Sequence, residues 1–159
     1  IEHFSRAWSI PTAILRLNYA CDLRYGVLVD IANRIWRGEP VDVSMGYFNT
    51  IWQGDANAMA LRAFDFLQSP PQVINMTGPE TLSIREVASR LASLLEKPIQ
   101  FTGAEGPTAL LNNAHRGYEL WGRPRVSSDE LIEAVAAWTR RGGRLLGKPT
   151  HFEARDGKF

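Results

Sequence analysis

The chain has 159 residues, of which 45% are hydrophobic and 22% are charged, and its formal net charge is +1. This length can form one domain with a substantial core, and the near-neutral charge gives no reason to expect nucleic acid or an anionic membrane as the main partner. No apolar run approaches membrane-spanning length. The single cysteine, Cys21, excludes an internal disulfide and fits a reducing compartment, so we expect a cytoplasmic protein.

Strands alternate with helices along the first half of the chain. Helices are indicated by apolar residues every three or four positions, and strands by short apolar runs. In order, the predicted elements are a helix end over 2–8, a strand over 12–17, a helix over 24–37, short strands over 41–43 and 50–52, and a helix over 55–68. Asp55 is predicted to be the N-cap of the last helix, because a carboxylate there accepts free backbone N–H groups.

The same alternation continues in the second half. The predicted elements are a strand over 73–76, a helix over 84–97, a strand over 99–102, a helix over 110–120 and a helix over 128–141. Ser83 with Glu86, and Ser127 with Glu130, have the spacing of capping boxes at the starts of two of these helices. Residues 144–159 form a polar tail that we expect to be loosely held.

This pattern predicts an α/β fold with parallel strands. The runs 12–17 and 73–76 have the composition of fully buried strands, which need neighbours on both sides. Only eleven residues precede the first of them, so we expect the chain to be the later part of a larger protein. Asn18 directly follows that strand, where the carboxyl ends of parallel strands form a ligand crevice.

The usual catalytic and metal-binding motifs do not occur. The sequence contains no Gly-x-Gly-x-x-Gly turn after a strand, no Walker loop, no His-Glu-x-x-His, no Cys-x-x-Cys and no Gly-x-Ser-x-Gly. Its three histidines lie far apart, without the spacing of metal ligands. We therefore predict no metal site and no catalytic centre within these residues.

Four segments occur in an order that is more informative than any one of them: AILRLNYACDLRYG at 13–26, IWQGDANAMALRAF at 51–64, VINMTGPETLSIREVASRL at 73–91 and ELWGRPRVSSDELIEAVAAW at 119–138. Together they resemble the C-terminal part of extended short-chain dehydrogenases/reductases. This is the NAD(P)-dependent epimerase/dehydratase family, which mostly acts on nucleotide sugars.

The resemblance implies the C-terminal part of a Rossmann-type parallel sheet plus a small α/β substrate-binding lobe. Residues 1–20 would end the Rossmann-type domain, 21–72 would form a helix, short strands and a return helix of the substrate lobe, and 73–78 would be a late strand of the sheet. Residues 79–143 would complete the substrate-binding lobe, and 144–159 would be the tail.

The resemblance also implies what this chain lacks. In the family, the glycine-rich cofactor loop and the catalytic Tyr-x-x-x-Lys pair belong to the N-terminal half, and neither is present here. NAD or NADP is expected in the full-length protein, none is expected to be bound by this fragment, and the fragment is expected to be inactive alone. The implied partner is a small-molecule substrate, a nucleotide sugar, which this half would hold over the nicotinamide.

Two candidate binding residues follow the first strand. Asn18 can donate a hydrogen bond to a substrate phosphate or sugar hydroxyl, or its amide can cap the following loop. Aligning the family pattern on Arg16 instead places Tyr19 at the asparagine position, and a tyrosine there can stack on a ring or pack in the core.

Three further candidates are Arg24, Gln53 and Arg116. Arg24 can clamp a phosphate or form a surface salt bridge, Gln53 can reach substrate from the start of a helix, and Arg116 lies where relatives place a phosphate-binding arginine. Many relatives carry another diphosphate-binding arginine seven residues before Asp55, and here that position is Phe48.

That departure leaves three hypotheses open. The leading one is the substrate-binding part of a nucleotide-sugar epimerase or dehydratase. The others are a relative that binds a ligand or protein without chemistry, and a reductase of a non-nucleotide substrate. Because a parallel strand with a free edge exposes apolar surface, we also expect the fragment to self-associate.

Overall fold

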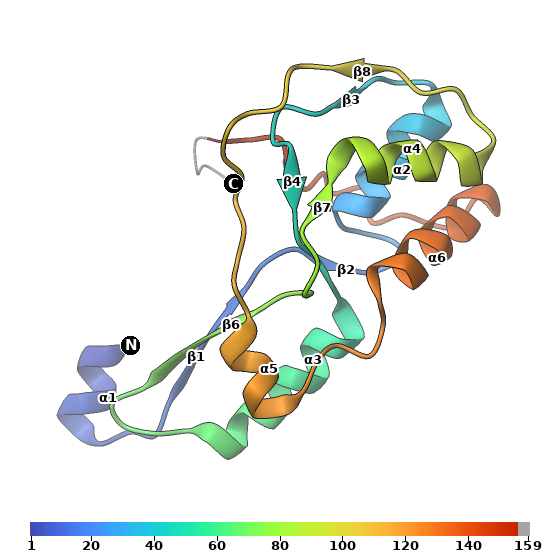
Figure 1. Ribbon diagram of the computed structural model, residues 1–159. Coiled ribbons are helices and arrows are strands. Elements are labelled where there is room, and N and C mark those ends of the chain that lie inside the picture. The colour runs from blue at the N-terminus through green and yellow to red at the C-terminus, as the bar shows by residue number, and fades with distance from the viewer. Residues whose placement is uncertain (156–159) are drawn as a thin grey trace.

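The computed structural model describes residues 1–155, which form helices and short strands arranged in two lobes (Figure 1). In chain order the elements are α1 (Glu2–Trp8), β1 (Ala13–Leu17), β2 (Ala20–Cys21), α2 (Val27–Arg37), β3 (Val41–Asp42), β4 (Tyr47–Phe48), β5 (Ile51–Trp52), α3 (Gln53–Arg62), the 3-10 helix η1 (Ala63–Phe66), β6 (Gln72–Met76), β7 (Leu82–Ser83), α4 (Ile84–Leu95), β8 (Phe101–Thr102), α5 (His115–Trp121) and α6 (Ser128–Arg140).

The described strands pair two by two, and three of the four pairs are parallel. The longest pair joins β1 to β6, from Ala13 opposite Gln72 to Leu17 opposite Met76. Two-residue parallel pairs join β2 to β5 and β3 to β8, while β4 and β7 are antiparallel. The predicted α/β class with parallel pairing is confirmed.

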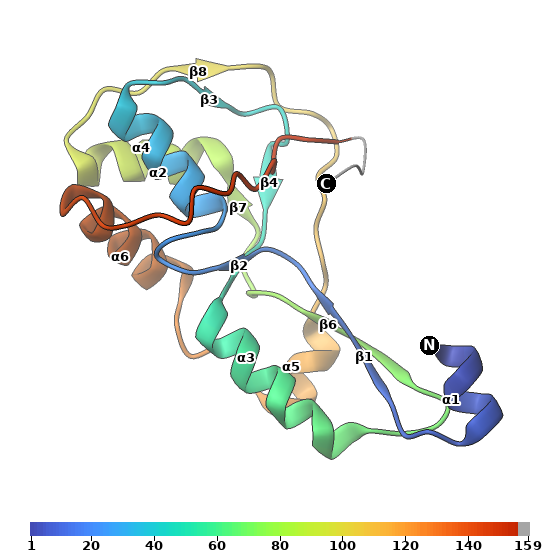
Figure 2. The same ribbon diagram turned by 180° about the vertical axis from the view of Figure 1, so that it is seen from behind.

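A helical lobe contains the larger core. In it, α2, α4 and α6 pack against one another and against the segment around β3 and β4 (Figures 1 and 2). The stripes that face inward are apolar at helical spacing, as in Leu28, Ile31 and Ile35 of α2. Both reciprocal hydrogen bonds of the predicted capping box at Ser127 and Glu130 are present at the start of α6.

A smaller sheet lobe contains β1, β6, α3 and α5. Its core gathers Ile51, Met59, Ile74 and Trp121 on one side of the β1–β6 pair. Among residues 1–155, β1 pairs only with β6 and none of its residues is fully buried, so one edge of this strand is unpaired. Its carboxyl end nevertheless points toward the helical lobe, which places the residues after Leu17 between the two lobes (Figure 2).

Asp55 is not the N-cap that the sequence suggested. The helix α3 begins two residues earlier, at Gln53, and no side chain caps its N-terminus. One oxygen, Oδ2, accepts the backbone N–H groups of Arg125 and Val126, both at 2.9 Å. Asp55 therefore fastens the segment before α6 to α3 and so helps to join the two lobes.

Other element boundaries also differ from the predictions. The helix expected over 110–120 begins only at His115, because residues 110–114 are irregular and Asn112 bonds to neighbouring segments. Its carbonyl accepts from Asn49, and its Nδ2 donates to the carbonyl of Arg16. The helix expected over 55–68 is α3 followed by the 3-10 turn η1. The two-residue strands β2, β4 and β7 were not predicted, since runs this short have no periodicity to detect.

The tail differs most from its expectation. Residues 144–155 run back along α2 as an ordered segment, here called the strap, whereas 156–159 lie outside the described residues (Figure 2). Phe152 is only 1% exposed and belongs to the core of the helical lobe. The backbone N–H and hydroxyl of Thr150 donate to Oδ2 of Asp30 at 2.7 and 2.6 Å. Burial raises the pKa of Asp30, and these two donors oppose the rise.

Replacing the buried strap residue, Phe152→Ala, should lower the free energy of unfolding by about 3–5 kcal/mol, because it leaves a cavity in the core. Urea denaturation of the 159-residue chain measures the change. The control Leu146→Ala removes a half-exposed strap side chain and should cost about 0.5 kcal/mol or less. Equal midpoints for Phe152→Ala and the unsubstituted chain would show that the strap does not contribute to the core.

Two substitutions test whether Asp55 acts as a hydrogen-bond acceptor. Asp55→Ala should lower the free energy of unfolding by about 1.5–3 kcal/mol, since it removes a charged acceptor from two backbone donors. Asp55→Asn retains one amide oxygen that can accept from the same donors, so its effect should be smaller. Thermal unfolding monitored by circular dichroism measures both variants, and equal losses would contradict the assigned hydrogen bonds.

No helix in the described part of the chain is both long and apolar enough to cross a membrane.

Candidate functional site

A cavity of about 270 Å³ lies beyond the carboxyl end of β1 and is here called the β1 cavity. Its walls come from the end of β1, the β2 segment, the start of α2, the first residue of α3 and the strap. The lining residues are Leu17, Tyr19, Ala20, Tyr25, Gly26, Gln53 and Thr150. Because parallel strands deliver ligand-binding groups at their carboxyl ends, this is the position where the fold predicts a ligand.

Tyr19 has a backbone conformation that is rare for its residue type. Its φ is 45°, in the left-handed region. The surroundings enforce this conformation, since the Tyr19 carbonyl accepts from the Thr50 hydroxyl at 2.5 Å and from the Ile51 N–H at 3.2 Å. Burial, with a smaller effect from Glu153, raises the pKa of the Tyr19 phenol, which favours the neutral hydroxyl donor at the cavity wall.

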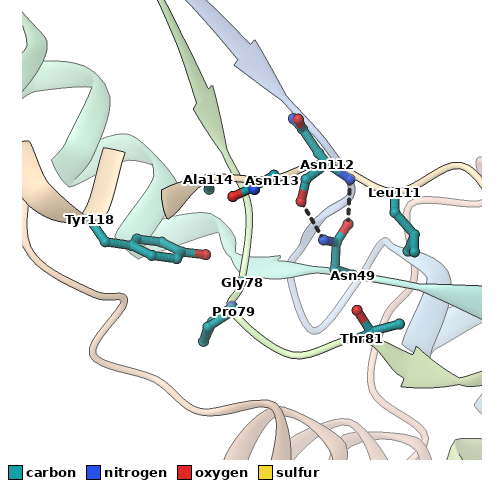
Figure 3. A pocket seen from close by; sticks show the side chains of 9 residues that line it. All are labelled: Asn49, Gly78, Pro79, Thr81, Leu111, Asn112, Asn113, Ala114 and Tyr118. Atoms are coloured by element: carbon teal, nitrogen blue, oxygen red, sulfur yellow. Dashed lines mark hydrogen bonds between the residues drawn. The ribbon is translucent and has the colours of Figure 1, made fainter. Parts of the chain in front are cut away.

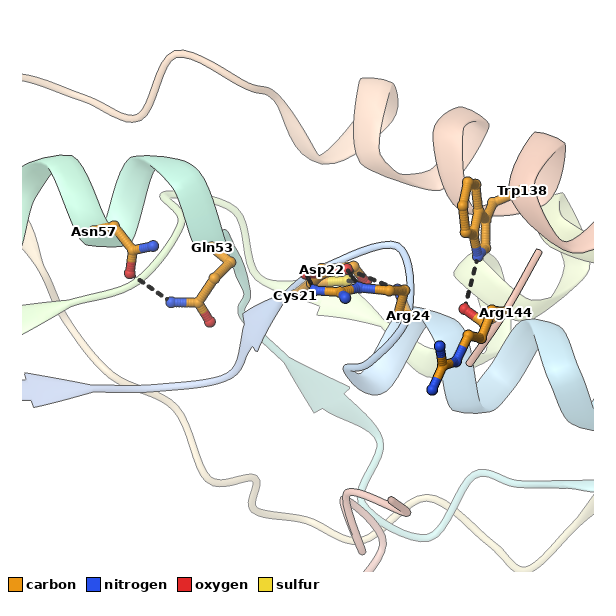
Figure 4. A network of polar contacts seen from close by, with 7 residues as sticks. All are labelled: Cys21, Asp22, Arg24, Gln53, Asn57, Trp138 and Arg144. Carbon is orange, nitrogen blue, oxygen red and sulfur yellow. Dashed lines mark hydrogen bonds and ion pairs between the residues drawn. The ribbon is translucent and has the colours of Figure 1, made fainter. Parts of the chain in front are cut away.

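Gln53 lines the opposite side of the same cavity. Its Nε2 donates to Oδ1 of Asn57 one turn along α3 at 2.8 Å (Figure 4). This bond orients the side chain and leaves its carbonyl oxygen available to a ligand. Two of the five predicted site residues, Tyr19 and Gln53, are thus brought to one cavity, although their roles in binding stay predictions.

Asn18 does not line the β1 cavity but bonds to Asn49. Its Nδ2 donates to Oδ1 of Asn49 at 2.7 Å, and its carbonyl accepts from the Thr77 hydroxyl. Asn49 is only 5% exposed, and its Nδ2 donates to the carbonyl of Asn112 (Figure 3). Asn112 in turn donates to the carbonyl of Arg16. These amide bonds tie three chain segments together beside the carboxyl end of β1.

This cluster borders a second cavity, of about 350 Å³, which sequence reasoning did not find. Asn49, Asn112, Asn113, Thr81 and Tyr118 contribute polar groups to its wall, and no lining residue is charged (Figure 3). Tyr118 donates to the Thr77 carbonyl at 2.7 Å, and burial raises its pKa to about 12. In the sequence, this second cavity is only weakly indicated by a polar pair, Asn49-Thr50, that directly follows an apolar residue.

The other two predicted site residues lie apart from the β1 cavity. Arg24 forms a surface salt bridge with Asp22, with its Nη2 2.8 Å from Oδ2 (Figure 4). Arg116 is exposed on α5 and donates to Oε1 of Gln72 at 2.9 Å. The structure therefore places neither guanidinium at the wall of the β1 cavity.

The β1 cavity is electrically neutral. None of its lining residues carries a formal charge. Phe48, at the position where relatives of the suggested family have a diphosphate-binding arginine, is fully buried in the core of the helical lobe. A diphosphate would thus find hydroxyl, amide and backbone donors in this cavity but no cation.

The turn between β2 and α2 does not fit a dinucleotide pyrophosphate. Such a group needs a glycine-rich turn between a strand and the start of a helix. The turn between β2 and α2 holds one glycine, Gly26, and a Cβ there would lie 2.9 Å from the Cα and Sγ of Cys21. On the side of Gly26 where a Cβ would lie, Cys21 therefore leaves no room for a ligand. Burial raises the pKa of that thiol to about 12, so Cys21 is an unreactive packing residue.

Within residues 1–155, no group of three or more histidine, cysteine, aspartate and glutamate side chains could hold a metal ion.

Comparison with known proteins gives different results at the levels of sequence and structure. No protein-family model matches the chain, and neither does any curated protein sequence. Solved structures do match. UDP-glucose 4-epimerase from Thermotoga maritima superposes with a TM-score of 0.71 at 17% identity, over 89% of this chain and 50% of that one.

Two further structures give the same result. UDP-glucuronic acid 4-epimerase from Bacillus cereus, in complex with NAD, has a TM-score of 0.72 at 17% identity over 87% of this chain and 48% of its own. UDP-glucose 4-epimerase from Thermus thermophilus, also with NAD, has a TM-score of 0.68 at 20% identity over 87% and 49%. The chain spans about half the length of these enzymes.

These matches confirm the fold that the four ordered segments suggested. The chain has the fold of about half of these UDP-sugar 4-epimerases.

Proposed function

We propose that this chain is the substrate-binding portion of an NAD(P)-dependent sugar-nucleotide epimerase or dehydratase, with the β1 cavity holding the sugar. The observation that carries the proposal is that Tyr19 and Gln53 line one cavity at the carboxyl end of the parallel pair, in a fold shared with UDP-sugar 4-epimerases. Holding a substrate in one orientation at such a site lowers the entropy cost of the reaction.

In this proposal the chain binds and orients but does not carry out the chemistry. The turn between β2 and α2 offers no cradle for the cofactor pyrophosphate, and the sequence contains no Tyr-x-x-x-Lys pair. NAD or NADP would be held by the other half of the full-length protein. If the gene encodes a Tyr-x-x-x-Lys pair shortly before Ile1, that supports an enzyme. If it encodes none there, that supports a binding protein.

A second candidate is a reductase or binding protein whose substrate is not a nucleotide diphosphate. It is favoured by the neutral lining of the β1 cavity and by Phe48, whose complete burial leaves no cation at that position. The two candidates differ in ligand. The first predicts binding of UDP-sugars, and the second predicts binding of sugars or other neutral polar molecules without a diphosphate.

Gln53→Ala and Tyr19→Phe in the full-length protein should each weaken binding of UDP-glucose or UDP-glucuronic acid about three- to tenfold, because each removes one hydrogen-bonding group. Isothermal titration calorimetry measures the affinity. The control Gln100→Ala removes an exposed glutamine side chain that does not line the cavity. Unchanged affinity in both cavity variants, or binding of the free sugars alone, would reject the sugar-nucleotide proposal in favour of the second candidate.

We also propose that the isolated chain self-associates through the unpaired side of β1. Large apolar side chains are exposed on α1 and along α3 and η1, among them Trp8 at 67%, Leu61 at 73% and Phe64 at 70%. An apolar pocket lined by Leu15, Phe64 and neighbours lies between β1 and η1. A second copy of the chain would cover this surface and the free strand edge together.

Sedimentation velocity should show dimers or larger species of the 159-residue chain, with a fraction that rises with concentration. Phe64→Arg should shift the population toward monomer, since it places a charge in the apolar surface. Leu110→Arg, which adds the same charge at an exposed apolar position in a distant loop, should leave the distribution unchanged. A chain that remains monomeric at every concentration would contradict self-association.

A further inference from the structure

A cleft of about 340 Å³ separates α2 from the strap and lies apart from both cavities described above. Its floor is one face of α2, where Asp30, Asn33 and Arg37 follow one another at helical spacing. Its other wall is the strap segment from Leu145 to Pro149, and Arg24 closes one end. The volume falls within the usual range of small-molecule sites.

The walls of this cleft are held in place on both sides. The Leu146 N–H donates to the Arg24 carbonyl at 3.0 Å, and Thr150 donates twice to Asp30. Gly147 has φ 67°, and a Cβ there would meet no other atom within 4 Å, so the glycine serves the backbone turn rather than close packing. That turn lies directly before Lys148, which lines the cleft.

The cleft carries more positive than negative charge, because three cations line it, Arg24, Arg37 and Lys148, beside the single carboxylate of Asp30. Arg37 and Lys148 form no ion pair within residues 1–155. Two nearby acidic groups have cationic partners, since Asp22 pairs with Arg24 and Glu153 pairs with Arg34. The Asp30 carboxylate accepts two hydrogen bonds from Thr150, which is neutral and does not cancel its charge. Asn33 adds an amide between the cations that makes no hydrogen bond within the described residues.

Arg24 is fixed for binding at the closed end of the cleft. Its Nε and Nη2 donate to the two carboxylate oxygens of Asp22, at 3.2 and 2.8 Å (Figure 4). This fork holds the guanidinium plane and leaves Nη1 free to donate. A fixed guanidinium, a mobile ammonium and a second guanidinium around one small space are the groups that bind phosphate oxygens.

We propose that this cleft is a binding site for the phosphate group of a small phosphorylated molecule, separate from the β1 cavity. Arg24, Arg37 and Lys148 contact the phosphate oxygens, and Asn33 contacts the rest of the ligand. Because Lys148 and Thr150 belong to the same short segment, a bound phosphate also holds the strap against α2. The strap contributes Thr150 to the β1 cavity, so filling the cleft stabilises the wall of that cavity.

The test uses inorganic pyrophosphate, glucose 1-phosphate and uridine monophosphate as probes, each titrated calorimetrically at constant ionic strength. Saturable binding is expected, with an affinity at least about tenfold weaker for the double variant Arg37→Ala/Lys148→Ala, because two of the three cations are lost. The control Arg6→Ala/Arg141→Ala removes the same charge from exposed positions elsewhere and should bind as the unsubstituted protein does. Comparison of the probes shows whether phosphate alone, a sugar phosphate or a nucleotide is preferred.

Hydrogen exchange supplies a second readout of the same site. Bound pyrophosphate should slow exchange of the backbone amides of residues 145–150, and this protection should be lost in the double variant. Three results would overturn the proposal: equal affinity in the double variant, no saturable binding of any of the three probes, or equal protection by sodium chloride at matched ionic strength. Gln53→Ala should leave pyrophosphate binding unchanged, so failure of the proposed substrate site and failure of this site give different results.

Discussion

The parallel pairing of β1 with β6 is the constraint on which the rest of the structure depends. It joins residues that are almost sixty positions apart and fixes both strands in one register. Just beyond the pair, the Asn18 N–H donates to the Met76 carbonyl and the Asn18 carbonyl accepts from the Thr77 hydroxyl. The segments that leave the two strands therefore run together toward the helical lobe. The β1 cavity, the asparagine cluster and the return of the chain into α2 all lie just beyond this pair.

Helical periodicity and capping chemistry made much of this architecture predictable from the sequence. The stripes of α2, α4 and α6 and the capping box at Ser127 are local features, determined by residues a few positions apart. The run from Ala13 to Leu17 was equally clear as a strand, and its polar end correctly indicated where a cavity would form. Local chemistry of this kind does not depend on which distant segment becomes the neighbour.

The errors share a different physical origin. Asp55 is of a residue type that often caps helices, yet its carboxylate accepts from backbone N–H groups about seventy residues away. No local sequence pattern indicates those partners. The strap is polar at half of its positions, and only its packing in the core of the helical lobe shows that Phe152 anchors it. For Asp55 and the strap, long-range contacts outweighed the local preference. The role of Asn18 in binding stays a prediction, and its amide bonds to Asn49 from another loop.

The strap also determines when the core of the helical lobe is complete. The helices of the lobe are complete once α6 has been synthesised, but their core still lacks Phe152, which follows α6 by about a dozen residues. Domains form from the N-terminal side as the chain emerges from the ribosome. Until the strap is in place, the three packed helices therefore surround an apolar site that Phe152 does not fill.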